Sequence, residues 1–196
     1  MPSLLVVVAS TRPTRVGGAV ADWFMAEAAA EGSFDVVLAD LAALDLPLMN
    51  EPQHPRLGQY VHGHTVEWSE MVRAADAAVL VMPEYNSGYT APLKNAIDYL
   101  VLEWKYLPVG LLAYGGAAGG ARAVQGLRPV LTNLSMVSTG STVLVHHVDK
   151  HLTEGGFAPS AAVAQAASAM LLELRALADA LAPLRSQALP ERMAAG

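Results

Sequence analysis

Residues 82–98 read MPEYNSGYTAPLKNAID, and this stretch decides the fold because it joins a buried strand to a helix. Upstream, residues 77–82 (AAVLVM) form a continuous apolar run, which is typical of a parallel strand covered on both faces. Downstream, apolar side chains recur at helical spacing and predict an amphipathic helix over 92–102. The polar loop between them lies where open α/β sheets bind their ligands.

The rest of the chain repeats this alternation of strand and helix. Apolar runs predict strands at 4–9, 34–38, 77–82, 109–114 and 141–146. Helical periodicity predicts helices near 17–30, 65–75, 92–102, 120–134 and 160–182. Parallel strands need crossover connections, so five such units predict an α/β fold with a doubly wound parallel sheet. The hydrophobic pattern alone leaves the order of the strands open.

Length and charge limit the organisation of the chain and its partners. The chain has 196 residues and no linker-like composition, which predicts a single domain over 1–185. The polar and small residues of 186–196 predict a frayed C-terminal tail. A net charge of −6 argues against nucleic acid as a partner, because that interaction needs a basic surface.

Cysteine usage and the N-terminal sequence limit the chemistry and the location. The chain contains no cysteine, which excludes disulfides, thiolate metal sites and a cysteine nucleophile. Any redox chemistry must therefore come from a bound cofactor. The apolar run 4–9 is too short to span a membrane, and no basic segment precedes it. We therefore expect a cytoplasmic protein with no membrane partner.

The loop after the first predicted strand has the composition of an anion site. Residues 10–17 read STRPTRVG, which places the Ser10 and Thr11 hydroxyls and two arginines at a predicted helix start. Helix N-termini offer unpaired N–H groups and the positive end of a dipole. The stretch matches neither the P-loop nor the GxGxxG fingerprint, so a monophosphate fits better than ATP or a dinucleotide. The alternative is an ordinary capped helix start with solvated arginines.

Three motifs together resemble one known family. These are PEYN followed by PLKNAID within 82–98, the loop at 10–17, and the run YGGAAGGARA at 114–123. In order and spacing they resemble the NAD(P)H-dependent FMN reductases over about residues 3–145. That family is flavodoxin-like and includes flavin, quinone, azo and chromate reductases. One departure is Ala9-Ser10, where the family usually has Gly-Ser.

The resemblance implies a fold, a cofactor and a set of contacts. It implies a flavodoxin-like three-layer sandwich with a five-stranded parallel sheet of order 2-1-3-4-5. FMN is the implied cofactor and NAD(P)H the co-substrate, and no side chain need be acid or base because the flavin carries the chemistry. The implied FMN-binding residues are Ser10, Arg12, Arg15, Val16, Gly17, Pro83, Glu84, Tyr85, Asn86, Ser87, Tyr114, Gly115 and Gly116.

Several of these residues have a structural alternative. The Glu84 carboxylate could instead bond neighbouring backbone or Lys94. Arg122 suits either the phosphate of a nicotinamide nucleotide or a solvated helix surface. The glycine-rich loop at 115–120 could be a turn without a ligand.

The remaining aromatic and histidine residues give weaker signals. His62 and His64 lie in an irregular segment without regular ligand spacing, so we predict no metal site. Residues 53–64 are interpreted as a long loop over the active site, where second substrates are discriminated. Trp68, Trp104 and Tyr106 are expected in the core or at a subunit contact.

The sequence therefore predicts an FMN-dependent oxidoreductase that uses NAD(P)H to reduce a small-molecule electron acceptor. We expect ping-pong hydride transfer, because no second dinucleotide fingerprint provides a separate NAD(P) pocket. The alternatives are a flavodoxin-like electron carrier and a non-catalytic FMN-binding protein. The resemblance also implies a homodimer or homotetramer.

Overall fold

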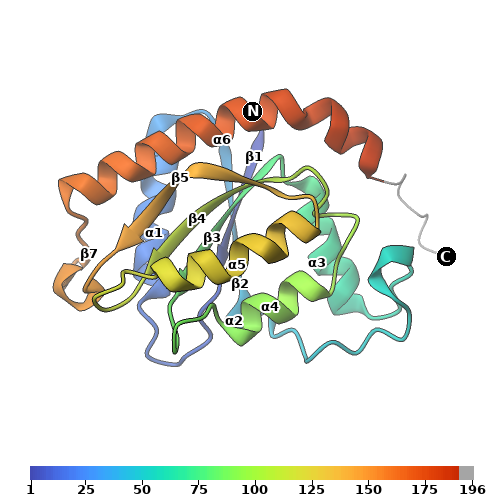
Figure 1. Cartoon of the computed structure of the whole chain (residues 1–196), viewed down its shortest axis with the longest axis horizontal. Coiled ribbons are helices and arrows are strands. Elements are labelled where there is room, and N and C mark those ends of the chain that lie inside the picture. Colours follow the sequence, from blue (N-terminus) through green and yellow to red (C-terminus); the bar gives the residue numbers. More distant parts are fainter. Residues whose placement is uncertain (190–196) are drawn as a thin grey trace.

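A computed structural model describes residues 1–189 and contains a five-stranded parallel sheet (Figure 1). The strands are β1 (Ser3–Val8), β2 (Asp35–Asp40), β3 (Ala77–Pro83), β4 (Pro108–Tyr114) and β5 (Val137–Val145). They lie in the order β2-β1-β3-β4-β5, which confirms the predicted topology. That the chain is one domain over 1–185 stays a prediction.

Helices cover both faces of the sheet and make three layers. One face carries α1 (Gly17–Glu31) and α6 (Ala161–Ala188). The other carries α2 (Leu41–Leu44), α3 (Gly63–Ala74), α4 (Ala91–Asp98) and α5 (Ala121–Asn133). Short elements that periodicity did not predict are α2, the 3₁₀ turns η1 (Pro55–Leu57) and η2 (Val148–His151), and a hairpin of β6 (Leu152–Thr153) and β7 (Gly156–Phe157).

The central strand β3 shows why the chain folds this way. Every residue of β3 is buried, and its side chains alternate between the two faces. Val79 and Val81 pack with α1 and α6, whereas Leu80 and Met82 pack with α3, α4 and α5. Burying one such side chain contributes about 1.5–3 kcal/mol, so a continuous apolar run stabilises a strand covered on both sides.

The helix predicted over 92–102 is shorter than expected, because α4 ends at Asp98. The carbonyl of Ile97 accepts hydrogen bonds from the Leu100 N–H (3.3 Å) and from Trp104 Nε1–H (2.9 Å). Trp104 is buried and packs edge-on against Trp68 with ring centroids 5.8 Å apart. The tryptophan therefore turns the chain back into the core, which confirms the core alternative for both tryptophans.

Strand β5 starts earlier than predicted and ends at Val145, not His146. Its register against β4 shifts between Val109 and Leu111, as expected for a bulge. At the bulge, Gly140 and Ser141 donate their N–H groups to the Glu173 carboxylate (2.6 and 2.9 Å). These bonds lower the pKa of Glu173, with the Ser141 N–H making the largest contribution. The Glu173 side chain of α6 thus satisfies two N–H groups at the bulge, where the regular hydrogen-bond ladder between β4 and β5 is interrupted.

The last helix is longer than predicted and is fastened to the opposite layer by one side chain. Arg185 is buried and donates to the carbonyls of Val72 (2.8 Å), Ala75 (3.0 Å), Glu103 (2.8 Å) and Lys105 (3.2 Å). Burial lowers the pKa of Arg185 to about 10, which leaves it charged at neutral pH.

The tail predicted to fray over 186–196 starts inside α6, since 186–188 are helical. The part of it over 190–196 lies outside the described residues. Helix α6 is long enough to cross a membrane, and an 18-residue stretch of it has a mean hydropathy of 1.3, which is apolar enough for a membrane span. Its apolar stripe instead packs against the sheet.

Candidate functional site

Three loops meet at the carboxyl edge of the sheet. They follow β1 (9–16), β3 (84–90) and β4 (115–120), and these strands are neighbours. Figure 1 shows the first two as the dark blue and green loops at the lower edge. The structure therefore brings together the three segments that the sequence singled out, at the edge where open α/β sheets bind ligands.

The first turn of α1 has the features of an anion-binding helix terminus. Its N-cap residue is Val16, and within residues 1–189 no side chain caps the turn and no acidic residue lies in it. The first N–H groups of a helix have no intrahelical partner, so this end is electropositive and unsatisfied. The sequence alternative of an ordinary side-chain-capped helix start is therefore wrong.

The Tyr114 hydroxyl lies directly beneath this turn. A Cβ placed on Gly17 would come within 2.6 Å of the hydroxyl oxygen, so glycine leaves the room that the tyrosine needs. Tyr114 is 3% exposed, and its hydroxyl has no hydrogen-bond partner in the described part of the chain. Burial raises the pKa of Tyr114, and the nearby Ser10 hydroxyl offsets this in part. The phenol therefore stays a protonated donor at the helix terminus.

Two contacts join the loop after β1 to the loop after β3. The Ser10 and Tyr85 hydroxyls are hydrogen-bonded at 3.1 Å. The Arg12 guanidinium lies 6.0 Å from the centre of the Tyr85 ring, at the limit of a cation–π contact.

Ala9, where the resemblance led us to expect glycine, is fully buried, and its N–H bonds the Val81 carbonyl at 2.9 Å. The extra methyl is therefore accommodated inside the sheet.

The two arginines of the first loop do different things. Arg15 forms an ion pair with Asp40 at the end of β2 and donates to the Ser10 carbonyl at 3.0 Å. Its charge is thus compensated, and it fixes the shape of the loop. Arg12 is exposed. Of the two predicted phosphate-binding arginines, Arg12 has the guanidinium that a ligand can reach without breaking an ion pair.

The loop after β3 is a tight, preformed turn. Tyr85 and Gly88 exchange backbone hydrogen bonds of 2.9 and 3.0 Å around Asn86 and Ser87. Both central residues have positive φ (50° and 66°), as in a type I′ turn. Thr90 then caps α4 through the Leu93 N–H (3.3 Å) and donates to the Ala9 carbonyl (2.9 Å). The loop after β3 is therefore fixed to the end of β1.

The glycine-rich loop after β4 is held by the chain that follows β5. Gly115 donates to the Val145 carbonyl (3.1 Å), and Gly116 accepts from the His147 N–H (2.9 Å). Gly120 has a φ of 92°, and a Cβ there would lie 2.4 Å from the Ala113 side chain. Glycine is thus required for the packing of this turn whether or not a ligand binds there.

One sequence alternative was that Glu84 pairs with Lys94, and the structure shows a different partner. Lys94 pairs with Asp98 on its own helix (2.6 Å), whereas Glu84 binds Arg122 on α5. One Glu84 oxygen accepts from Arg122 Nη1 (2.9 Å) and the other from the Arg122 backbone N–H (3.0 Å). Arg122 lies on α5 with its side chain 63% exposed, as the alternative of a solvated helix surface predicts, but it also pairs with Glu84. The sequence offered no signal for a pair that spans two loops.

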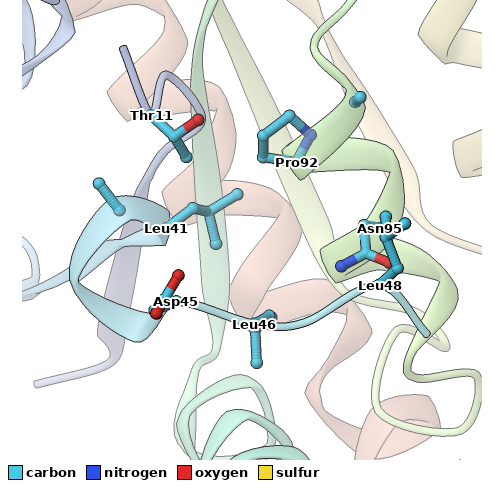
Figure 2. A pocket seen from close by; sticks show the side chains of 9 residues that line it. Thr11, Leu41, Asp45, Leu46, Leu48, Pro92 and Asn95 are labelled. Atoms are coloured by element: carbon cyan, nitrogen blue, oxygen red, sulfur yellow. The ribbon is translucent and has the colours of Figure 1, made fainter. Parts of the chain in front are cut away.

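A pocket of about 430 Å³ lies beside these loops (Figure 2). Thr11 and Pro92 lie opposite each other at the top of the view. Leu41 and Asp45 of the α2 region lie below Thr11, and Leu46 and Leu48 lie along the bottom and the right. Asn95 fixes the segment below by donating to the Pro47 carbonyl (2.7 Å) and accepting from the Met49 N–H (2.9 Å). Five residues between 41 and 48 therefore line the cavity, whereas the predicted loop 53–64 contributes none of the lining residues.

The histidines of that loop form hydrogen bonds to one asparagine. His62 and His64 stack with ring centroids 5.2 Å apart, and both bond Asn50 (3.2 and 3.1 Å). Among residues 1–189, no three His, Cys, Asp or Glu side chains are grouped to hold a metal ion.

Comparison with known proteins places the chain in a family. A family model described as NADPH-dependent FMN reductase matches residues 2–150. An NAD(P)H-dependent FMN reductase of Schizosaccharomyces pombe is 38% identical over 126 residues, which cover 63% of this chain and 63% of that protein. The chain therefore spans less than two thirds of the length of this relative. An NAD(P)H-dependent FMN reductase of Saccharomyces cerevisiae is 32% identical over 150 residues, covering 71% of this chain and 78% of that protein.

Solved structures agree on the architecture. An oxidoreductase from Corynebacterium diphtheriae superposes with a TM-score of 0.70 at 21% identity, covering 92% of this chain and 98% of that one. At that identity the likeness establishes the flavodoxin-like fold. The family model that matches residues 2–150 shows that the chain belongs to the NADPH-dependent FMN reductase family.

Proposed function

We propose that this chain binds FMN and uses NAD(P)H to reduce a small-molecule electron acceptor. The observation that carries the proposal is the first turn of α1, which lacks a side-chain cap among residues 1–189 and lies over the unpaired, buried Tyr114 hydroxyl. An unsatisfied helix terminus with a donor beneath it fits a phosphate monoester. The names of the yeast relatives support the same activity.

The residues of the three loops take distinct roles in this proposal. Ser10, Arg12, Val16 and Gly17 hold the phosphate, and Arg15 acts by shaping their loop. Residues 83–87, Gly115 and Gly116 surround the isoalloxazine ring, whereas the buried Tyr114 hydroxyl beneath the first turn of α1 is assigned to the phosphate. When bound, FMN supplies the redox chemistry, taking a hydride from NAD(P)H and passing electrons to the acceptor. The protein orients the reactants through a preformed turn, and no side chain is assigned an acid or base role.

Anaerobic mixing of the FMN-loaded protein with NADPH or NADH tests the activity. Rapid loss of flavin absorbance, followed by reoxidation with a quinone, is the expected result. Initial rates at several fixed quinone concentrations should give parallel double-reciprocal lines, because both substrates use one stacking surface. Stoichiometric FMN binding with slow reduction by both nucleotides would favour the rival electron carrier. An absence of FMN binding would overturn the proposal.

We also propose that the chain forms a homodimer or homotetramer in the cytoplasm. Large apolar side chains are exposed between α2 and α3 and in the first turns of α3, namely Leu48, Met49, Leu57, Val61 and Val66. Exposed apolar side chains of this kind suit an isologous contact. Sedimentation that gives a single species of 20.6 kDa at micromolar concentration would contradict this assembly. A composition without cysteine suits a reducing compartment.

Replacing Arg12 with alanine should weaken FMN binding about tenfold or more. A charge-assisted hydrogen bond contributes about 1.5–3 kcal/mol, and the exposed Arg12 guanidinium is placed to make one to the phosphate. Riboflavin lacks the phosphate and should lose little affinity. Fluorescence titration of both flavins measures the difference, and equal losses would show that Arg12 does not contact the phosphate.

We assign the discrimination of electron acceptors to the pocket of Figure 2. Ala42 lines this pocket, so Ala42→Phe should fill part of the 430 Å³ and raise KM for a bulky quinone about tenfold. Ala43 is exposed and does not line the pocket, so Ala43→Phe is the matched control. Reduction of the bound flavin by NADPH should be unchanged in both. Equal KM values for the two variants would remove the pocket from acceptor selection.

A further inference from the structure

Glu84 lies in the loop after β3 that is assigned to the flavin ring, and its surroundings are unusual for a surface carboxylate. It follows directly on β3, its side chain is 8% exposed, and its backbone N–H bonds the Tyr114 carbonyl at 3.0 Å. A Cβ placed on Gly115 would lie 3.6 Å from the Glu84 Cβ. The carboxylate is therefore held between the two loops assigned to the isoalloxazine ring.

Two positive groups compensate this charge. Arg122 Nη1 lies 2.9 Å from one carboxylate oxygen. The other oxygen accepts the Arg122 backbone N–H (3.0 Å) in the first turn of α5, whose N-cap, Gly120, makes no side-chain cap within the described residues. Glu84 thus serves as the cap of α5 and meets the positive end of the helix dipole. The Arg122 side chain is 63% exposed, so the fixed member of the pair is the glutamate.

This arrangement matters because flavin reduction places negative charge on the pyrimidine side of the ring. An uncompensated carboxylate nearby would disfavour the reduced cofactor by Coulomb repulsion, which in partly buried sites is poorly screened. From this geometry we propose that Arg122 is a positioning residue that neutralises Glu84 and thereby sets the affinity of the protein for reduced relative to oxidised FMN. The inference rests on the proposed function, because it requires FMN between these loops.

Three variants test it through the ratio of dissociation constants for oxidised and reduced FMN, obtained from the midpoint potential of bound FMN. Arg122→Gln removes the guanidinium, leaves the carboxylate with the backbone N–H of α5 alone, and should shift the ratio about three- to tenfold against the reduced form. A tenfold shift is about 30 mV for a two-electron couple. Glu84→Gln leaves an unpaired guanidinium and should shift it in the opposite direction. The double variant removes both charges and should return close to the parent value.

Opposite signs for the single variants distinguish charge compensation from a structural role. If the pair only fastened the loops, both single variants would weaken oxidised and reduced FMN alike and leave the ratio unchanged, which would overturn the inference. Shifts of the same sign would overturn it as well. Thermal melts check that each variant is folded. If the parent protein fails to bind FMN, the proposed function itself fails, so the two failures are distinguishable.

Discussion

Replacing Arg185 with methionine is expected to lower the free energy of unfolding by about 3–5 kcal/mol, the range seen when one partner of a buried charged network is removed. The guanidinium satisfies four carbonyl oxygens, from Val72, Ala75, Glu103 and Lys105. Methionine keeps much of the apolar volume but removes the donor from the Ala75, Glu103 and Lys105 carbonyls, while the Val72 carbonyl keeps the Ala75 N–H (3.3 Å). For a chain of this size the loss corresponds to a fall in melting temperature of roughly 6–20 °C.

Two further variants separate this network from a general effect of charge on α6. Arg175 lies on the same helix, is partly exposed, and pairs with Asp179 (2.9 Å), so Arg175→Met should change the melting temperature far less. Arg185→Lys keeps the charge but loses the fork of donors, so it should fall between the parent and Arg185→Met. Chemical denaturation measures all three. Similar losses for Arg175→Met and Arg185→Met would contradict the proposed importance of the buried carbonyl network.

Replacing Gly17 with alanine should damage the phosphate site and the packing beneath it. The new Cβ would lie 2.6 Å from the Tyr114 hydroxyl and 3.4 Å from Val8. Tyr114 is buried and its ring is rigid, so either the tyrosine or the first turn of α1 must move. Overpacking of this kind costs about 1–3 kcal/mol. We expect FMN affinity to fall by about tenfold or more, because the displaced N–H groups and hydroxyl no longer converge.

The neighbouring glycine provides the matched control. A Cβ on Gly18 would meet no atom within 4 Å, and both residues lie in the first turn of the same helix. Alanine is the better helix former by about 0.5–1 kcal/mol, so Gly18→Ala should leave FMN binding intact and slightly stabilise the protein. Fluorescence titration and thermal denaturation report the two effects separately. Equal behaviour of the two variants would show that the Gly17–Tyr114 approach does not shape the site.

The architecture and the edge that carries the site were predictable from local sequence. The apolar run at 77–82 and the spacing of Leu93, Ala96 and Ile97 express the periods of a buried strand and an amphipathic helix. Polar and glycine-rich segments follow three of the predicted strands. Because parallel strands share one carboxyl edge, these loops had to meet. The order of the strands came from the motif resemblance, because periodicity carries no information on which strands are neighbours.

Errors arose where a contact distant in sequence overrode a local pattern. The helix predicted to 102 stops at Asp98 because Trp104 takes the Ile97 carbonyl. The predicted frayed tail began at residue 186, whereas α6 extends to Ala188. Arg185 fastens the end of this helix to the carbonyls of Val72, Ala75 and Glu103, which lie more than 80 residues away in the sequence. Hydrogen bonds of this kind depend on which backbone carbonyls the fold brings next to a side chain, and the local sequence does not specify that.

The sequence by itself determined that this chain is a strand–helix alternation whose polar and glycine-rich loops at 10–17, 83–87 and 115–120 lie at one edge of a sheet. The tertiary structure alone decided the partners of the charged groups, pairing Arg15 with Asp40 and Glu84 with Arg122, and placing Tyr114 beneath Gly17. The physical reason is that periodicity and turn chemistry act over a few residues. An ion pair or a close approach instead requires the relative placement of elements that only the packed sheet and helices define.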